Sequence, residues 1–282
     1  MTKKIYFEND SGRVEMFLGG TGPIRVTALS GFGNPEKSYD SVKFAGKDGQ
    51  KTLNDVVCPR TLIISGDIKA DSREFLEEIF KVFGNSGTLY LDYGEKKRKI
   101  PCSQVTFSDG TRKGKFMNFV LTLVSDEAYF TDFYQTDLPI YSREGRICGS
   151  VKFPCILSVK TTQKTAENFG EEKVEPAIKI YNFHDENSEI TGNIVIENQT
   201  TGQKIELMTG TEENEEIIID IKHRKITSSL RGNILHLISD DTFLNKFWLN
   251  PGENILKAEH NNVGEEISVV CSYYSNYREG IY

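Results

Sequence analysis

The sequence predicts a mainly β protein with two domains. The first is expected to be a split β-barrel or sheet with one α-helix, and the second a β-sandwich. Three observations predict this fold class: a length of 282 residues, which suits two domains, apolar residues that alternate with a period of two in the first part, and short strand patterns between turn signals in the last part. The domain boundary is expected near residue 135, giving domains 1–135 and 136–282.

Apolar side chains share one face in several segments of the first domain. The clearest is 116–124, where Met117, Phe119, Leu121 and Leu123 alternate with more polar neighbours. The segments 14–18, 24–28 and 88–93 repeat the pattern. Such alternation is typical of an antiparallel sheet with one buried face.

One helix is expected, at about Ser72–Phe83. Asp71 suits the N-cap and Glu74 follows three residues later, as in a capping box. Apolar residues then recur at helical spacing and Gly84 is placed to end the helix at C′. This stripe consists of Phe75, Leu76, Ile79, Phe80 and Phe83. The helix is expected to cover the apolar face of the sheet.

The segment between Gly31 and Asn54 loses the strand pattern and is rich in polar and turn residues. Segments of this length without a core pattern are usually functional or mobile. Two interpretations stay open, a surface loop and an extended arm. If the segment is an arm, it carries the candidate contacts to another subunit or partner, namely Phe32, Asn34, Pro35, Lys47 and Gln50.

Residues 126–145 are interpreted as a docked linker, because aromatic residues and Pro139 occur along them. Strand patterns follow at the spacing of a sandwich or jelly roll. The expected strands are 178–181, 193–197, 204–207, 216–221, 233–238, 254–258 and 267–274.

The net charge of −7 makes non-specific DNA binding unfavourable, although an acidic wall would suit a channel that lets DNA pass. The five cysteines are widely spaced and lack a C-x-x-C pair, which favours isolated thiols over a Cys148–Cys155 bridge. We find no signal peptide and no apolar run long enough for a membrane span, so synthesis and folding in the cytoplasm are expected.

No motif indicates catalysis, a cofactor or a metal. The G-x-S-x-G nucleophile motif is missing, and the glycines at 19–22 lack the Lys-Ser/Thr ending of a phosphate loop. The four histidines are scattered, and the acidic runs 212–216 and 240–241 lack calcium-loop spacing. We therefore expect no enzyme, no cofactor and no metal site.

Aromatic residues gather on or beside the last expected strands, and aromatic faces can stack on sugar rings. The candidate sugar contacts are Trp248, Tyr273, Tyr274 and Tyr277. Packing in the core is the favoured explanation of these residues, so carbohydrate binding is an alternative function only.

Several segments together resemble the siphophage distal tail proteins, the Dit-like tail components. The most specific is the turn at 249–255, Leu-Asn-Pro-Gly-Glu-Asn-Ile, with Asp220-Ile221-x-x-Arg224-x-Ile226 upstream. In the first domain the matching blocks are 24–35, 60–66, the expected helix and 126–130. None of these segments is a catalytic motif.

The resemblance implies a structural protein of the virion tail tip. Its first domain would form a homo-hexameric ring by extending strands into neighbouring copies, and its second would be a galectin-like sandwich that projects outward. The ring would join the tail tube and the tape-measure-linked hub to baseplate or receptor-binding proteins, and DNA would pass through it. No specific nucleic-acid or membrane partner is implied, and phage, prophage and tail-like bacteriocin stay open as sources.

Overall fold

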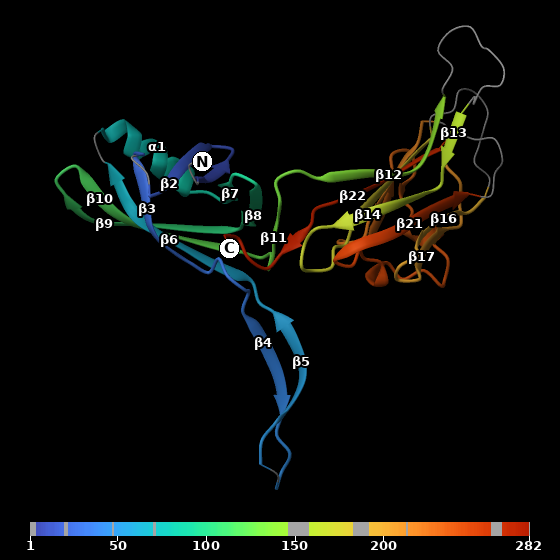
Figure 1. The fold of residues 1–282 in the computed structure, drawn as a ribbon, viewed down its shortest axis with the longest axis horizontal. Helices are drawn as coiled ribbons and strands as arrows, with labels where there is room; N and C mark the ends of the chain where they lie inside the picture. Colours follow the sequence, from blue (N-terminus) through green and yellow to red (C-terminus); the bar gives the residue numbers. More distant parts are fainter. Residues whose placement is uncertain are drawn as a thin grey trace. The chain divides into compact units, whose positions relative to one another are not determined.

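The computed structural model describes residues 4–19, 22–46, 48–69, 72–145, 158–182, 192–212, 214–260 and 267–281. The chain divides into two units (Figure 1). Unit 1 comprises residues 1–133 and 277–282, and unit 2 comprises 134–276. The predicted boundary after residue 135 lies close to this division. The last six residues, assigned to the second domain from the sequence, pack with the first unit.

Unit 1 contains a ten-stranded sheet in the order β23-β11-β8-β7-β1-β2-β3-β6-β10-β9. Its strands are β1 (Lys4–Asn9), β2 (Gly12–Leu18), β3 (Ile24–Ser30), β6 (Arg60–Lys69), β7 (Gly87–Tyr93), β8 (Lys96–Cys102), β9 (Gln104–Lys113), β10 (Phe116–Ser125), β11 (Phe130–Asp132) and β23 (Asn276–Tyr277). Among the described strands the two ends of this order do not pair with each other, so the sheet is open and forms no closed barrel.

The sheet splits between β2 and β3. These parallel strands pair only at Phe17 with Arg25 and at Leu18 with Val26. A bulge near Thr27 then shifts the alternation of β3, so Ala28 is exposed although the sequence pattern placed it on the buried face. Most of the other predicted core residues of this sheet, including Met16 and Leu123, are buried as expected, whereas Leu18 and Tyr93 are half-buried.

Helix α1 (Arg73–Phe83) lies in the predicted place, but its ends differ from the prediction. Its N-cap is Ser72, whose hydroxyl accepts a hydrogen bond from the Phe75 N–H at 3.1 Å. The predicted cap, Asp71, lies outside the described residues. Gly84 ends the helix with a right-handed φ of −83° and not in the left-handed C′ conformation expected from the sequence.

Helix α1 packs on the core of unit 1 through Ile79, Val82 and Phe83. Phe83 stacks on Phe107 of β9 with ring centroids 5.3 Å apart. The predicted covering of the apolar sheet face is therefore observed, with Val82 as a buried residue that the sequence stripe omitted.

Unit 2 has two sheets around one core. The seven-stranded sheet has the order β13-β12-β22-β15-β18-β19-β20, and the four-stranded sheet the order β14-β21-β16-β17. The strands are β12 (Thr136–Gly145), β13 (Ser158–Thr161), β14 (Gln163–Asn168), β15 (Ala177–Asn182), β16 (Ile194–Asn198), β17 (Gln203–Leu207), β18 (Glu216–Asp220), β19 (Lys225–Ser228), β20 (Gly232–Asn233), β21 (Gly252–His260) and β22 (Ile267–Tyr273). Both sheets contribute isoleucines to this core, as a sandwich requires.

Two predictions for unit 2 were wrong. Half of the predicted linker is strand β12, which pairs with β22 and buries Ile140 and Tyr141. The expected strand 233–238 is the short strand β20 followed by the 3₁₀ helix η1 (Leu235–Leu237). A second 3₁₀ helix, η2, spans Leu244–Lys246. The predicted fold class, mainly β with one α-helix in the described part, is confirmed.

Candidate assembly interface

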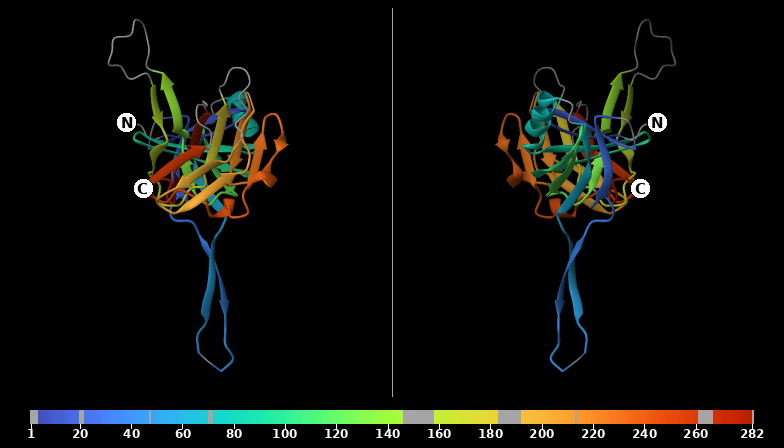
Figure 2. Two further views of the ribbon diagram at one scale, coloured as in Figure 1. Left: turned by 90° about the vertical axis from the view of Figure 1, so that its right-hand side faces the viewer. Right: turned by 90° about the vertical axis from the view of Figure 1, so that its left-hand side faces the viewer.

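The most exposed element of unit 1 is a hairpin of β4 (Lys37–Val42) and β5 (Lys51–Val57), which we call the arm (residues 37–57). Figures 1 and 2 show the two strands reaching away from the ten-stranded sheet. Their ladder runs from Lys37 with Val57 to Val42 with Lys51, with a bulge after Asp40. The arm interpretation of this segment is therefore the one observed, although the sequence did not predict its strands.

The arm exposes large apolar side chains without a covering element among the described residues. The most exposed are Tyr39 at 61%, Leu53 at 61%, Val56 at 54% and Phe44 at 53%. A two-stranded hairpin alone is marginally stable in water. Apolar side chains on such a hairpin are typical of a surface that another chain covers.

An ion pair joins the strands near the base of the arm. Lys37 Nζ lies 2.6 Å from the Asp55 carboxylate. This hydrogen bond raises the pKa of Lys37 and lowers the pKa of Asp55, so both groups are charged at neutral pH. Within residues 37–57 there are four lysines and three aspartates, so the arm has a net charge of +1 in a chain of net charge −7.

The residues predicted to contact another subunit or partner are not all exposed. Asn34 and Gln50 are exposed, and Gln50 Oε1 accepts a hydrogen bond from the Ser41 hydroxyl at 3.2 Å. Pro35 is half-buried. Phe32 is only 3% exposed and stacks on Phe130 with centroids 6.1 Å apart, so its side chain belongs to the core of unit 1. Lys47 lies outside the described residues.

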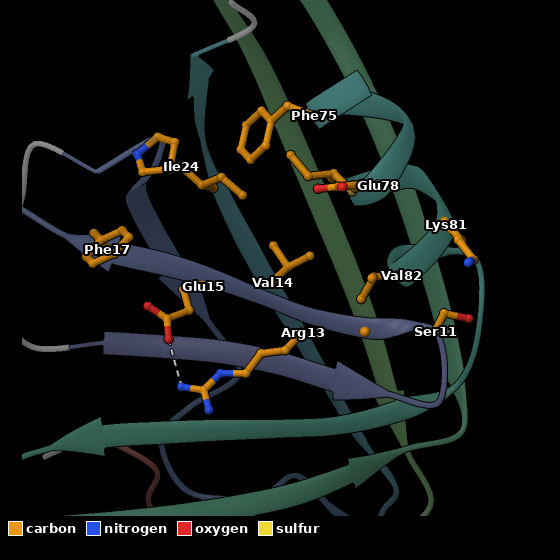
Figure 3. Close-up of a pocket in the computed structure, with 13 residues that line it drawn as sticks. Ser11, Arg13, Val14, Glu15, Phe17, Ile24, Phe75, Glu78, Lys81 and Val82 are labelled. Atoms are coloured by element: carbon orange, nitrogen blue, oxygen red, sulfur yellow. Dashed lines mark hydrogen bonds and ion pairs between the residues drawn. The ribbon is translucent and has the colours of Figure 1, made fainter. Parts of the chain in front are cut away.

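A cavity of about 540 Å³ lies where the sheet splits, between β2, the start of β3 and helix α1 (Figure 3). Val14, Ile24 and Phe75 give it apolar walls. At its edge Arg13 pairs with Glu15 at 2.8 Å. No histidine or cysteine belongs to its described lining. The described residues also hold no cluster of three or more metal-ligating side chains.

The turn that carried the family resemblance has a structural role. Gly252 has φ +86°, a conformation that favours glycine. The fully buried Asn254 accepts a hydrogen bond from the Asn250 N–H at 2.8 Å and donates to the Asn250 carbonyl at 2.7 Å. Asn198 donates to the Asn254 amide oxygen at 3.4 Å. These residue types are needed because a buried turn must satisfy its own backbone groups.

The structure does not bring the predicted sugar contacts together as one exposed aromatic surface. Tyr273 is 4% exposed and its hydroxyl donates to the Glu167 carbonyl. Trp248 is half-buried, and Lys173 Nζ lies 4.4 Å from its ring centroid. Tyr274 is half-buried in unit 2, whereas Tyr277 belongs to unit 1, where the Arg98 guanidinium lies 4.0 Å over its ring.

A buried ion pair lies in unit 2. Glu215 has no exposed surface, and Arg231 donates to both of its carboxylate oxygens, at 2.7 and 3.0 Å. Burial opposes ionisation of Glu215, but the hydrogen bonds from Arg231, Ser228 and the Glu212 N–H outweigh it and lower the pKa of Glu215. Arg231 also binds Thr209 and the Gly210 carbonyl, both at 2.9 Å. The pair therefore fixes the loop before β18.

Two of the three described cysteines, Cys102 and Cys271, are buried thiols of low reactivity. Cys58, Cys102 and Cys271 form no disulfide. Burial raises the pKa of Cys102 and of Cys271 to about 12, so both are protonated at neutral pH. The pair Cys148 and Cys155 lies outside the described residues. In the described part, no helix is long and apolar enough to cross a membrane.

We compared the chain with protein families, curated proteins and solved structures. Residues 170–277 match the family model of the siphovirus-type tail component, C-terminal domain. No curated protein matches the chain. The crystal structure of Dit (gp 19.1) of phage SPP1, described as a paradigm of the hub adsorption apparatus in phages that infect Gram-positive bacteria, aligns with 97% of this chain and 99% of that chain, at 13% identity and a TM-score of 0.64.

A chain of the phage P2 baseplate in its activated conformation with calcium aligns over 96% of this chain and 97% of its own length. The identity is 12% and the TM-score 0.46. The resemblance predicted from the sequence is confirmed by the family model and by the SPP1 structure: this chain has the fold of SPP1 Dit, and its residues 170–277 match the C-terminal domain of siphovirus-type tail components.

Proposed function

We propose that this chain is a structural component of a phage tail-tip hub or baseplate, and that six copies form a ring through which DNA passes. The observation that carries the proposal is the arm. It is a hairpin with exposed apolar side chains, in a chain with the fold of SPP1 Dit. An arm of this kind gains stability by lying against a neighbouring copy.

Strand edges supply the second part of the contact. β9 is the last strand in the order of the ten-stranded sheet and pairs with β10 alone among the described strands. All of its ten residues are half-buried or exposed, and its outer edge offers backbone donors and acceptors. Pairing of such edges joins subunits without special side chains. Identical contacts that join one copy to the next close into a ring when their rotation closes.

The charge of the chain agrees with a passage for DNA. A net charge of −7 repels phosphate, so a ring of such chains would not hold the DNA that moves through it. The arm, with its net charge of +1, is free of this repulsion when it lies on an acidic neighbour. In this proposal the chain is not an enzyme, and it has the virion tail tip as its location and the tail tube and baseplate proteins as partners.

The second unit would project outward as a galectin-like sandwich that binds receptor-binding or other baseplate proteins. Carbohydrate binding stays an alternative prediction for this unit. The Lys173 ammonium over Trp248 and the burial of Tyr273 leave less aromatic surface for a sugar than the sequence predicted.

Native mass spectrometry combined with negative-stain imaging tests the ring. We expect particles of six copies with a central hole, formed by the chain alone or on addition of its tail-tube partner. Monomers under all conditions, with and without that partner, would reject the proposal.

A further inference from the structure

Arg60 occupies an unusual position at the base of the arm. It is the first residue of β6, it follows the arm directly, and it is only 4% exposed. Its guanidinium donates to four backbone carbonyls: Gly31 at 2.9 Å, Gly33 at 2.7 Å, Ala128 at 3.0 Å and Arg278 at 2.7 Å. Three separate parts of unit 1 therefore meet at one side chain.

The cation is held without an ion pair among the described residues. Carbonyl dipoles surround it, and its guanidinium lies 4.7 Å from the centroid of the Phe130 ring. Burial lowers the pKa of Arg60 to about 10, so it stays protonated at neutral pH. The planar fork of an arginine holds five N–H donors in fixed directions and can serve four carbonyls, whereas a lysine ammonium has only three donors.

The carbonyls of Gly31 and Gly33 belong to the segment that leads into the arm. Gly31 has φ +83°, and a Cβ on it would lie 2.0 Å from the Thr61 carbonyl oxygen. On the other side of the arm the Cys58 N–H donates to the Glu36 carbonyl at 2.9 Å. We call residues 31–36 and 58–60 the arm foot. Its conformation is set by tight backbone contacts, with Arg60 as the link between its two halves.

The carbonyl of Arg278 belongs to residues 277–281, which return to unit 1 after unit 2 and which we call the return segment. The Gly280 N–H donates to the Phe32 carbonyl of the arm foot at 2.8 Å. A Cβ on Gly280 would lie 2.8 Å from both Leu91 and Phe130, so this position is closely packed. Arg98, only 8% exposed, donates to the Glu279 carbonyl.

We propose that Arg60 and the return segment form a clasp that sets the position of the arm, so that the path of the chain into and out of unit 2 is coupled to the assembly surface of unit 1. Ala128 precedes unit 2 and Arg278 follows it, and both carbonyls bind the same guanidinium as the arm foot. A displacement of either segment removes hydrogen bonds from Arg60 and frees the arm foot. The consequence for assembly rests on the proposed ring, whereas the coupling itself does not.

Hydrogen–deuterium exchange of the full chain tests the clasp, at concentrations where the wild type is monomeric. The variants are Arg60→Met, which removes the donors, and Gly280→Ala, which crowds the return segment. Arg73→Met is the matched control, because the Arg73 side chain is 91% exposed on helix α1. We expect both variants to raise exchange in peptides 28–36 and 57–62 by about tenfold or more. Peptides from β1, β7, β15 and β22 should keep wild-type protection, and the control should match wild type throughout.

Two results would overturn the clasp. One is unchanged hydrogen exchange at the arm foot in Gly280→Ala. This variant alone tests the clasp if Arg60→Met does not fold. The other is an equal rise in β1 and β7, which would show that the contacts only stabilise unit 1 as a whole. In a concentration series, both variants should need about tenfold more protein to assemble than the control does. If the wild type never assembles, the proposed ring is wrong. The exchange experiment then tests the clasp independently of the ring.

Discussion

Replacing Phe44 and Leu53 by aspartate is expected to leave the chain folded but monomeric at concentrations where the wild type assembles. Both side chains are more than half exposed on the arm, so the substitutions disturb no described core contact. In an assembled ring they would be covered, and each aspartate would then place an unpaired charge in an apolar contact. Because every 1.4 kcal/mol is a factor of ten, we expect assembly to weaken by at least about 100-fold.

Sedimentation velocity over a concentration series measures this effect, with circular dichroism to check folding. Phe169→Asp is the matched control, since Phe169 is 67% exposed in unit 2 and lies outside the proposed contact. If the arm variant assembles as tightly as the control, the arm is not the assembly surface.

Arg231→Met is expected to produce the largest loss of stability in unit 2. The substitution leaves the Glu215 carboxylate buried without its cation, and it also removes the donors to Thr209 and Gly210. Breaking a buried ion pair from one side typically costs about 3–5 kcal/mol of the free energy of unfolding. Replacing both partners by apolar residues should recover much of this loss.

The same pair predicts a pH dependence. The pKa of Glu215 is lower in the folded chain than its ordinary value of 4.5. Its contribution to stability is therefore complete above that value and is lost as the pH falls through the folded pKa. Glu215→Gln should weaken this acid sensitivity of unit 2.

Urea denaturation at several pH values measures both effects. The control is Lys257→Met, which removes the partner of the exposed Glu259 in the same unit and should change stability little. Equal stabilities for Arg231→Met and this control would contradict the role assigned to the buried pair.

The core strands could be predicted from the sequence because each has one buried face. In β10 the residues Met117, Phe119, Leu121 and Leu123 alternate without interruption, and all four are buried. The bulge in β3 has no signature in the residue pattern, so the sequence placed Ala28 on the buried face although it is exposed. Strand β12 was taken for a linker because Pro139 and neighbouring polar residues hid its two buried positions.

The assembly surface was predictable only in outline. Neither face of the arm is buried in the chain, so its residues follow no alternation and its strands gave no signal. The clasp was equally hidden. Arg60 appeared only as part of a family-like segment, and its acceptors are backbone carbonyls up to 218 residues away, which side-chain patterns do not reveal.

Intermolecular photocrosslinking from the arm tests the central claim most directly. A photoreactive phenylalanine analogue replaces Phe44, and equal amounts of isotopically light and heavy chain are mixed before assembly. The account predicts a crosslinked ladder that ends at six copies, with peptides joining the arm of one copy to unit 1 of a differently labelled copy. Crosslinks confined to single chains, in samples where particles have formed, would contradict it.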